Sequence, residues 1–183
     1  MDIDEMIRGR RSIRKYQNQD IADSIIEEIL DLARHAPSSM NGQPWRFTVV
    51  RKDETKRKLA EIKNKYCPVE KRMYRADFIQ NASAVIIVCV DKAKSYDRGI
   101  ENGVLASANI LLAAYNKGLG SVYMSAYKAD EPEVSREVRE VLGIPEQIDP
   151  ISIIPLGYPD ETPEPKNMKP LYGIVSYETF AGR

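Results

Sequence analysis

The amino-terminal region carries a dense group of positive charges that could hold a phosphate. Five cations and no acid occur in the segment Arg8-Gly9-Arg10-Arg11-Ser12-Ile13-Arg14-Lys15. Guanidinium groups and a serine hydroxyl offer several charge-assisted donors that can converge on phosphate oxygens. The same residues could instead form a solvated basic turn or an arm that binds nucleic acid.

A second polar group lies in a loop enclosed by two prolines. Its sequence is Pro37-Ser38-Ser39-Met40-Asn41-Gly42-Gln43-Pro44, which presents two hydroxyls and two amides. Because the prolines stiffen the loop, it could hydrogen-bond a polyol or the edge of a ring at low entropic cost. The alternative is a helix-to-strand connection whose polar side chains only cap backbone groups.

Two later segments could also approach a ligand. The first is Gly118-Leu119-Gly120-Ser121-Val122-Tyr123-Met124-Ser125-Ala126, whose small residues allow backbone N–H groups to come close to a flat molecule. The second is Pro155-Leu156-Gly157-Tyr158-Pro159, which is followed by Lys166 and Lys169. Taken alone, the first segment could equally be a turn, and the two lysines could close over an anion or serve solubility.

Side chains that could act as a nucleophile, a general base or a metal ligand are scarce. His35 is the single histidine, which excludes a zinc site of several imidazoles. It lies in the last turn of a predicted helix, where a cation is favoured, so we expect a surface residue without a catalytic role. Cys67 and Cys89 are too few for an iron–sulfur cluster, and we expect Cys89 to be an inert core thiol. We therefore expect no metal site.

The charge balance and the apolar runs indicate a soluble protein. Lys and Arg together number 27, as do Asp and Glu, so no bulk attraction to nucleic acid or to an anionic membrane follows. The longest apolar run, residues 84–90, is far shorter than the ~20 residues of a membrane helix. The first residues carry acids where a signal peptide carries cations. The low cysteine count and the length of 183 residues predict one cytoplasmic domain, residues 1–183.

Strands and helices are predicted without a regular βα alternation, which favours an α+β fold. Apolar residues at three- and four-residue spacing predict a helix over 21–35, with Asp20 as its N-cap and Pro37 as its stop. Further helices are predicted at 52–66, 70–80, 100–117 and 131–142. Strands are predicted at 45–50, 84–90, 120–125, 151–156 and 174–177. The second strand is a continuous apolar run, typical of a strand buried on both faces.

In this order and at these spacings, the four polar segments resemble the FMN-dependent nitroreductase family. The matching motifs are Arg10-Arg11-Ser12-x-Arg14, Pro37-Ser38-Ser39-x-Asn41-x-Gln43-Pro44-Trp45, Gly118-Leu119-Gly120-Ser121 and Pro155-Leu156-Gly157-Tyr158-Pro159. The resemblance implies a nitroreductase-like α+β fold with a helix-flanked, mixed central sheet. It also implies an intertwined homodimer, in which the C-terminal segment, about residues 160–183, extends onto the partner and exchanges a strand.

The resemblance further implies one FMN at each of two sites across the dimer interface. At the phosphate and ribityl end, the resemblance implies Arg10, Arg11 and Ser12, together with Lys166 and Lys169 at the phosphate. At the ring it implies Arg14 at the pyrimidine edge and the backbone N–H groups of Ser125 and Ala126. The other subunit would contribute Pro37, Ser38, Ser39 and Asn41. Two positions depart from the family pattern. Met168 stands where an arginine is common, and Ser125-Ala126 stands where Gly-Gly is frequent.

The implied activity transfers reducing equivalents from NADH or NADPH through FMN to nitroaromatic, quinone or similar acceptors in a ping-pong cycle. Because the flavin does the chemistry, no catalytic side chain is required. The expected partners are a second copy of the chain and a small-molecule acceptor, with neither nucleic acid nor membrane. Two alternatives stay open: a flavin store or sensor without efficient turnover, and a phosphate- or nucleic-acid-binding module built on residues 8–15.

Overall fold

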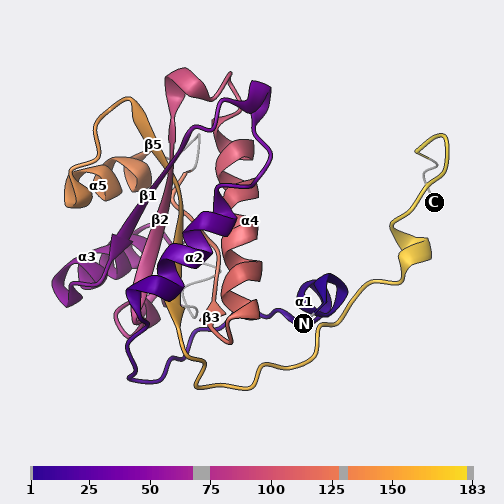
Figure 1. Cartoon of the computed structure of the whole chain (residues 1–183), viewed down its shortest axis with the longest axis horizontal. Coiled ribbons are helices and arrows are strands. Elements are labelled where there is room, and N and C mark those ends of the chain that lie inside the picture. Colours follow the sequence, from indigo (N-terminus) through magenta and orange to yellow (C-terminus); the bar gives the residue numbers. More distant parts are fainter. Residues whose placement is uncertain (1, 68–74, 128–131, 181–183) are drawn as a thin grey trace.

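A five-stranded sheet lies at the centre of the part of the chain that the computed structural model describes, residues 2–67, 75–127 and 132–180 (Figure 1). Its strands follow the order β1-β2-β5-β3, and β4 also pairs with β5. The strands are β1 (Trp45–Val50), β2 (Ala84–Asp91), β3 (Gly120–Ser121), β4 (Met124–Ser125) and β5 (Ile148–Gly157). These strands pair antiparallel, and a parallel bridge joins Ser12 to Ser121.

Helices cover both faces of this sheet (Figure 1). α2 (Asp23–Ala33) and α4 (Gly99–Asn116) lie on one face, and α3 (Asp53–Lys65) and α5 (Glu133–Leu142) lie on the other. α1 (Ile3–Gly9) contacts α4 and buries no residue. Alternate side chains of β2 divide between two cores: Ile86 and Val88 pack with α2 and α4, whereas Val85 and Ile87 pack with α3 and α5. The predicted two-sided burial of this strand is thus confirmed. None of the helices in the described residues is long and apolar enough to cross a membrane.

The N-cap expected for the second helix is wrong, and the helix expected over 70–80 is described only from residue 75 onward. Ala22, rather than Asp20, stands at the N-cap of α2, and no side chain caps that end. The helix expected over 70–80 falls partly on residues 68–74, outside the described part, and residues 77–79 form only a 3-10 turn. There the N–H of Ala76 donates to the side chain of Asn64 on α3 at 2.7 Å, so the segment follows α3 instead of forming its own helical ladder.

The strand expected over 120–125 is interrupted, and Pro155 explains the break. The pairing of Gly120 with Gly157 and of Met124 with Ile153 places Val122 opposite Pro155. Proline has no N–H to donate across the ladder. The segment is therefore divided into β3 and β4, each two residues long.

The strand expected over 174–177 is absent from the chain described here. The segment after Pro159 leaves the body as an extended arm, residues 161–180, with a 3-10 turn at Leu171–Gly173 (Figure 1). A strand needs a neighbour to satisfy its backbone groups, and the arm runs beside no sheet edge of its own chain. Its apolar residues are consequently exposed, among them Leu171 at 72% and Ile174 at 61%.

Candidate functional site

The two polar groups near the amino terminus lie at opposite ends of α4. At its first turn, the N–H of Ser39 donates to Oδ1 of Asn102 at 3.1 Å. At its last turn, Gly9 packs so closely on Tyr115 that an added Cβ would lie 2.3 Å from the phenol oxygen. Thirteen residues separate these two positions of α4, which is about 20 Å along a helix. One chain therefore does not bring residues 10–12 and residues 37–41 to the same ligand.

Asn102 anchors the loop of residues 37–44 to the body. It is buried, its Nδ2 donates to the carbonyl of Ser95, and its own carbonyl accepts from Nε1 of Trp45, each at 3.1 Å. Together with the bond from Ser39, Asn102 thus forms hydrogen bonds with three separate segments of the chain. A polar residue on the buried face of a small-residue helix was the sequence signal for this role, and sequence reasoning missed it.

The loop itself is held in an unusual backbone conformation. Met40, Asn41 and Gln43 have φ angles of 50°, 53° and 46°, in the left-handed region that favours glycine. Such conformations cost energy and persist where the surrounding structure imposes them, often at binding sites. Oγ of Ser38 accepts the N–H of Gln43 at 3.1 Å, so it already holds the turn. Met40 is 81% exposed, and Asn41 is also at the surface.

The other end of α4 gathers positive charge. The arm brings Lys166 to this place, where its Nζ donates to the carbonyl of Ile7 at 3.4 Å. Desolvation and then the charges of Arg10 and Arg11 lower the pKa of Lys166, and desolvation followed by Arg11 lowers the pKa of Arg10. The three cations are thus close enough to repel one another, which an anion between them would relieve.

Arg11 also forms hydrogen bonds within the chain. Its Nη1 donates to the carbonyls of Arg8, Gly9 and Arg10 at 2.7, 2.8 and 3.1 Å, at the end of α1. Part of the guanidinium therefore satisfies carbonyls that α1 leaves unpaired. A cavity of about 420 Å³ adjoins the cluster and is lined by Arg10, Arg11, Tyr115, Ser121 and Glu161, among others.

The open edge of β3 and β4 links this basic cluster to the Ser125-Ala126 segment. The N–H of Ala126 donates to the carbonyl of Ile151 at 2.9 Å, so Ala126 faces β5. In an antiparallel ladder the residues between such pairs point their N–H and C=O groups the other way. Ser121 and Ser125 therefore face outward. Of the two N–H groups implied at the flavin, that of Ser125 is directed to the open edge, and that of Ala126 is already bonded inside the sheet.

Both ends of this open edge are occupied by other parts of the chain. The carbonyl of Ser121 accepts the N–H of Ile13 at 3.1 Å, which places residues 10–14 at one end. The carbonyl of Ser125 accepts Nζ of Lys63 at 2.7 Å at the other end. Lys63 was not singled out from the sequence, because its partner lies 62 residues further along the chain.

The remaining expected site residues are exposed. Arg14 and Pro37 lie at the surface, and the arm carries Lys169 and Met168 at its surface as well. The backbone N–H groups of Arg14 and Lys15 both donate to Oε1 of Glu161, which ties the basic segment to the start of the arm.

The structure also places His35 and Cys89, for which we expect no catalytic role. His35 is exposed, as expected. Cys89 is buried, and desolvation raises the pKa of its thiol to about 12, which fits an inert core thiol. No group of three or more potential metal-ligating side chains occurs in the residues that the structure describes.

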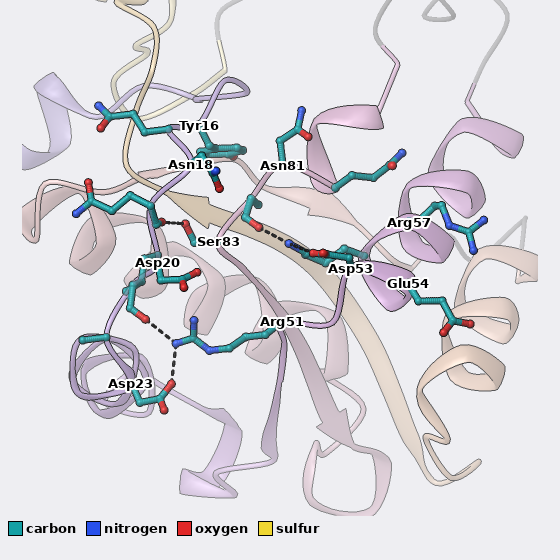
Figure 2. Close-up of a pocket in the computed structure, with 17 residues that line it drawn as sticks. Tyr16, Asn18, Asp20, Asp23, Arg51, Asp53, Glu54, Arg57, Asn81 and Ser83 are labelled. Carbon is teal, nitrogen blue, oxygen red and sulfur yellow. Dashed lines mark hydrogen bonds and ion pairs between the residues drawn. The ribbon is translucent and has the colours of Figure 1, made fainter.

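A larger cavity, of about 1200 Å³, lies elsewhere, between residues 16–23, the start of α3 and residues 80–83 (Figure 2). Its cations are already engaged. Nη2 of Arg51 donates to the carbonyl of Ile21 at 2.7 Å and to Asp23 at 2.6 Å, and Nζ of Lys56 lies 2.8 Å from the carbonyl of Ala82. These bonds hold three chain segments together, so the groove is a structural junction (Figure 2).

Comparison with known proteins gives consistent matches over nearly the whole chain. The family model "Nitroreductase family" matches residues 7–158. A putative NADH dehydrogenase/NAD(P)H nitroreductase of Archaeoglobus fulgidus is 41% identical over 160 residues, which cover 86% of this chain and 85% of that protein. An FMN-dependent nitroreductase from Clostridium difficile R20291 superposes with a TM-score of 0.85 at 30% identity, covering 97% and 100% of the two chains. An iodotyrosine deiodinase solved with FMN and 3-iodo-L-tyrosine gives a TM-score of 0.82 at 26% identity, covering 98% of this chain and 100% of that one.

Proposed function

This chain belongs to the nitroreductase family, and from that premise we propose that it is an NAD(P)H-dependent FMN oxidoreductase acting on nitroaromatic, quinone or similar acceptors. The observation that carries the proposal is the open edge of β3 and β4. The basic segment lies at Ser121 and the outward N–H of Ser125 lies four residues away, about 13 Å along a strand. A phosphate donor set and a ring-edge donor are thus aligned on one edge of the sheet.

The donor set fits the phosphate of FMN. Arg10, Ser12 and Lys166 offer cationic and hydroxyl donors, and the mutual repulsion within the cluster favours a bound anion. Arg11 would add a part of its guanidinium while it caps α1. Lys169 would approach from the arm, and Arg14 would lie toward the ring. When bound, FMN supplies the hydride chemistry, and these side chains bind and orient it.

We propose that the complete site needs two chains. Ser38, Ser39 and Asn41 lie about 20 Å along α4 from the basic cluster, so a second subunit would bring its own loop to the first subunit's FMN. Apolar residues on α4 and on the arm supply surface for such a contact: Ile100, Val104 and Leu105 on the helix, and Leu171, Ile174, Val175 and Phe180 on the arm, are exposed. A homodimer of single-domain chains, residues 1–183, would cover them.

We also propose small-molecule partners and a cytoplasmic location. The net charge of zero favours small molecules over nucleic acid as partners. Both cysteines are free, which suits a reducing cytoplasm.

Spectroscopy and kinetics of the purified protein test the proposal. We expect a visible flavin spectrum, one releasable FMN per chain, a dimer by light scattering, and oxidation of NADH or NADPH that depends on a nitroaromatic or quinone acceptor. Parallel lines in double-reciprocal plots would agree with a ping-pong order. A colourless protein would contradict flavin binding, whereas a yellow protein without turnover would favour a flavin store.

A further inference from the structure

Two lysines of α3, Lys56 and Lys63, donate to backbone carbonyls of other segments, unlike the residues that only form ion pairs on the helix surface. Lys58 pairs with Glu54 and Arg57 pairs with Glu61, both on exposed surface of the same helix. Lys63 is partly buried and donates to a backbone carbonyl, that of Ser125, at 2.7 Å. Placing an ammonium group in a partly desolvated position costs free energy unless it is well hydrogen-bonded. The Ser125 carbonyl does not require this bond, because it lies at the edge of the sheet, where a water molecule can donate to it instead.

The segment that Lys63 contacts pairs with the sheet over a short stretch, on its inner side. β4 is two residues long, and the break opposite Pro155 separates it from β3. Oγ of Ser125 and the backbone of Tyr127 bond each other within a tight turn, which adds no tie to the body. On the sheet side, Ser125 is paired with Ser152, and the N–H of Ala126 donates to Ile151. On the outward side, the bond from α3 holds the Ser125 carbonyl.

The carbonyl and the N–H of Ser125 point to the same side, since both belong to a residue outside the hydrogen-bonded pairs of the ladder. The two groups belong to consecutive peptide planes joined at the Ser125 Cα, so a bond that holds the carbonyl restrains the rotation that would turn the N–H away. We propose that Lys63 is a positioning residue, which holds the Ser125 N–H in the orientation that meets the ring edge of FMN. This proposal rests on the function proposed above.

The test compares FMN release from the purified holoprotein for three variants. Lys63→Met removes the donor and keeps much of the apolar stem, and Lys63→Arg keeps a cationic donor. Lys65→Met is the matched control, because Lys65 lies two residues away on α3 but pairs with Glu137 on α5. FMN fluorescence on dilution gives the dissociation constant, and the visible absorption spectrum reports the surroundings of the ring.

We expect Lys63→Met to weaken FMN binding up to about tenfold, because a misdirected Ser125 N–H would lose its hydrogen bond to the ring, and to shift the flavin absorption band. Lys63→Arg should recover most of the affinity, and Lys65→Met should leave both readouts unchanged. A lower melting temperature with unchanged affinity and spectrum would show a structural role and overturn the proposal. If the original protein binds no FMN, the proposed function fails too; if it binds FMN and Lys63→Met binds equally well, only the role of Lys63 fails.

Discussion

Isoleucine side chains are mostly buried in the body of the molecule, whereas the isoleucine of its carboxyl-terminal arm is exposed. Ile153, in the middle of β5, is fully buried between α3, α5 and the sheet, whereas Ile174 on the arm is 61% exposed. An isoleucine exposed in an extended segment gains nothing from this chain's own core. Contiguous exposed apolar residues in a soluble protein commonly mark a contact surface. The arm therefore has a sequence suited to a surface outside its own chain.

The body also carries exposed apolar side chains. On α4, Ile100, Val104 and Leu105 follow helical spacing and face outward, although the opposite side of the same helix is buried against the sheet. α1 has no buried residue at all, and its Ile3 and Ile7 are more than half exposed. Body and arm thus differ in where their apolar side chains lie: most are buried within the chain in the body, and those of the arm are exposed.

Removal of the arm should have the largest effect. A chain ending at Thr162 lacks Lys166, Lys169 and the apolar arm residues, but it retains the whole described sheet. We expect it to fold as a monomer and to lose FMN, because both the association surface and part of the phosphate site are gone. Circular dichroism and light scattering measure the two properties. A truncated dimer that still holds FMN would contradict the division between body and arm.

A matched pair of isoleucine substitutions should sharpen the comparison. Ile153→Ala creates a cavity in the core and should lower the free energy of unfolding by ~2–5 kcal/mol. Ile174→Ala should instead weaken association, so that its effect on the melting temperature grows smaller as the protein is diluted to the monomer. Thermal denaturation at several protein concentrations separates the two. Equal, concentration-independent losses would mean that the arm packs on its own chain.

Substitution of the loop at the first turn of α4 should have a smaller effect. Ser39→Ala together with Asn41→Ala should weaken FMN binding tenfold or more, because two hydrogen bonds of ~1 kcal/mol each would be lost. Fluorescence titration measures the affinity. His35→Ala, nearby and exposed, is the control and should leave turnover unchanged. Loss of turnover in that control with FMN still bound would restore a catalytic role for the histidine.

Arg14→Met should have the smallest effect of the four. Arg14 is exposed in the single chain and, in the proposed dimer, would lie beside the pyrimidine edge of the ring. Reduction of the flavin adds negative charge there, and a neighbouring cation stabilises it. Loss of one or two kcal/mol would lower the two-electron potential by ~20–40 mV while FMN stays bound. A spectroelectrochemical titration with no downward shift would place Arg14 away from the ring.

Local patterns predicted most of the body, because each of its elements has a one-sided or two-sided apolar pattern of its own. The strand at 45–50 and the buried run at 84–90 appear within one residue of expectation. α1 was missed, although Asp2 and Glu5 form a capping box that marks a helix start. It buries no side chain, so apolar periodicity did not reveal it.

Expectations that depend on distant residues were less complete. The break between β3 and β4 comes from Pro155, which lies more than thirty positions later and has no N–H at the point where Val122 needs one. The motifs predicted the candidate site residues, but the separation of these residues along α4 and the hydrogen bond from Lys63 to Ser125 follow only from the fold. The strand expected at 174–177 has an apolar pattern but no neighbour in its own chain, and pattern alone does not supply one.

In the proposed dimer, α4 carries the loop of residues 37–44 at one end and the basic cluster at the other, which limits how the length of this helix can change over evolution. An insertion of one residue between Asn102 and Tyr115 would turn one end of the helix by about 100° relative to the other. It would also lengthen the helix by about 1.5 Å. In the proposed dimer every α4 serves both sites, so one such insertion would misalign the loop of one and the phosphate segment of the other together. We expect natural length variation to accumulate in the surface connections, and this helix to keep its length.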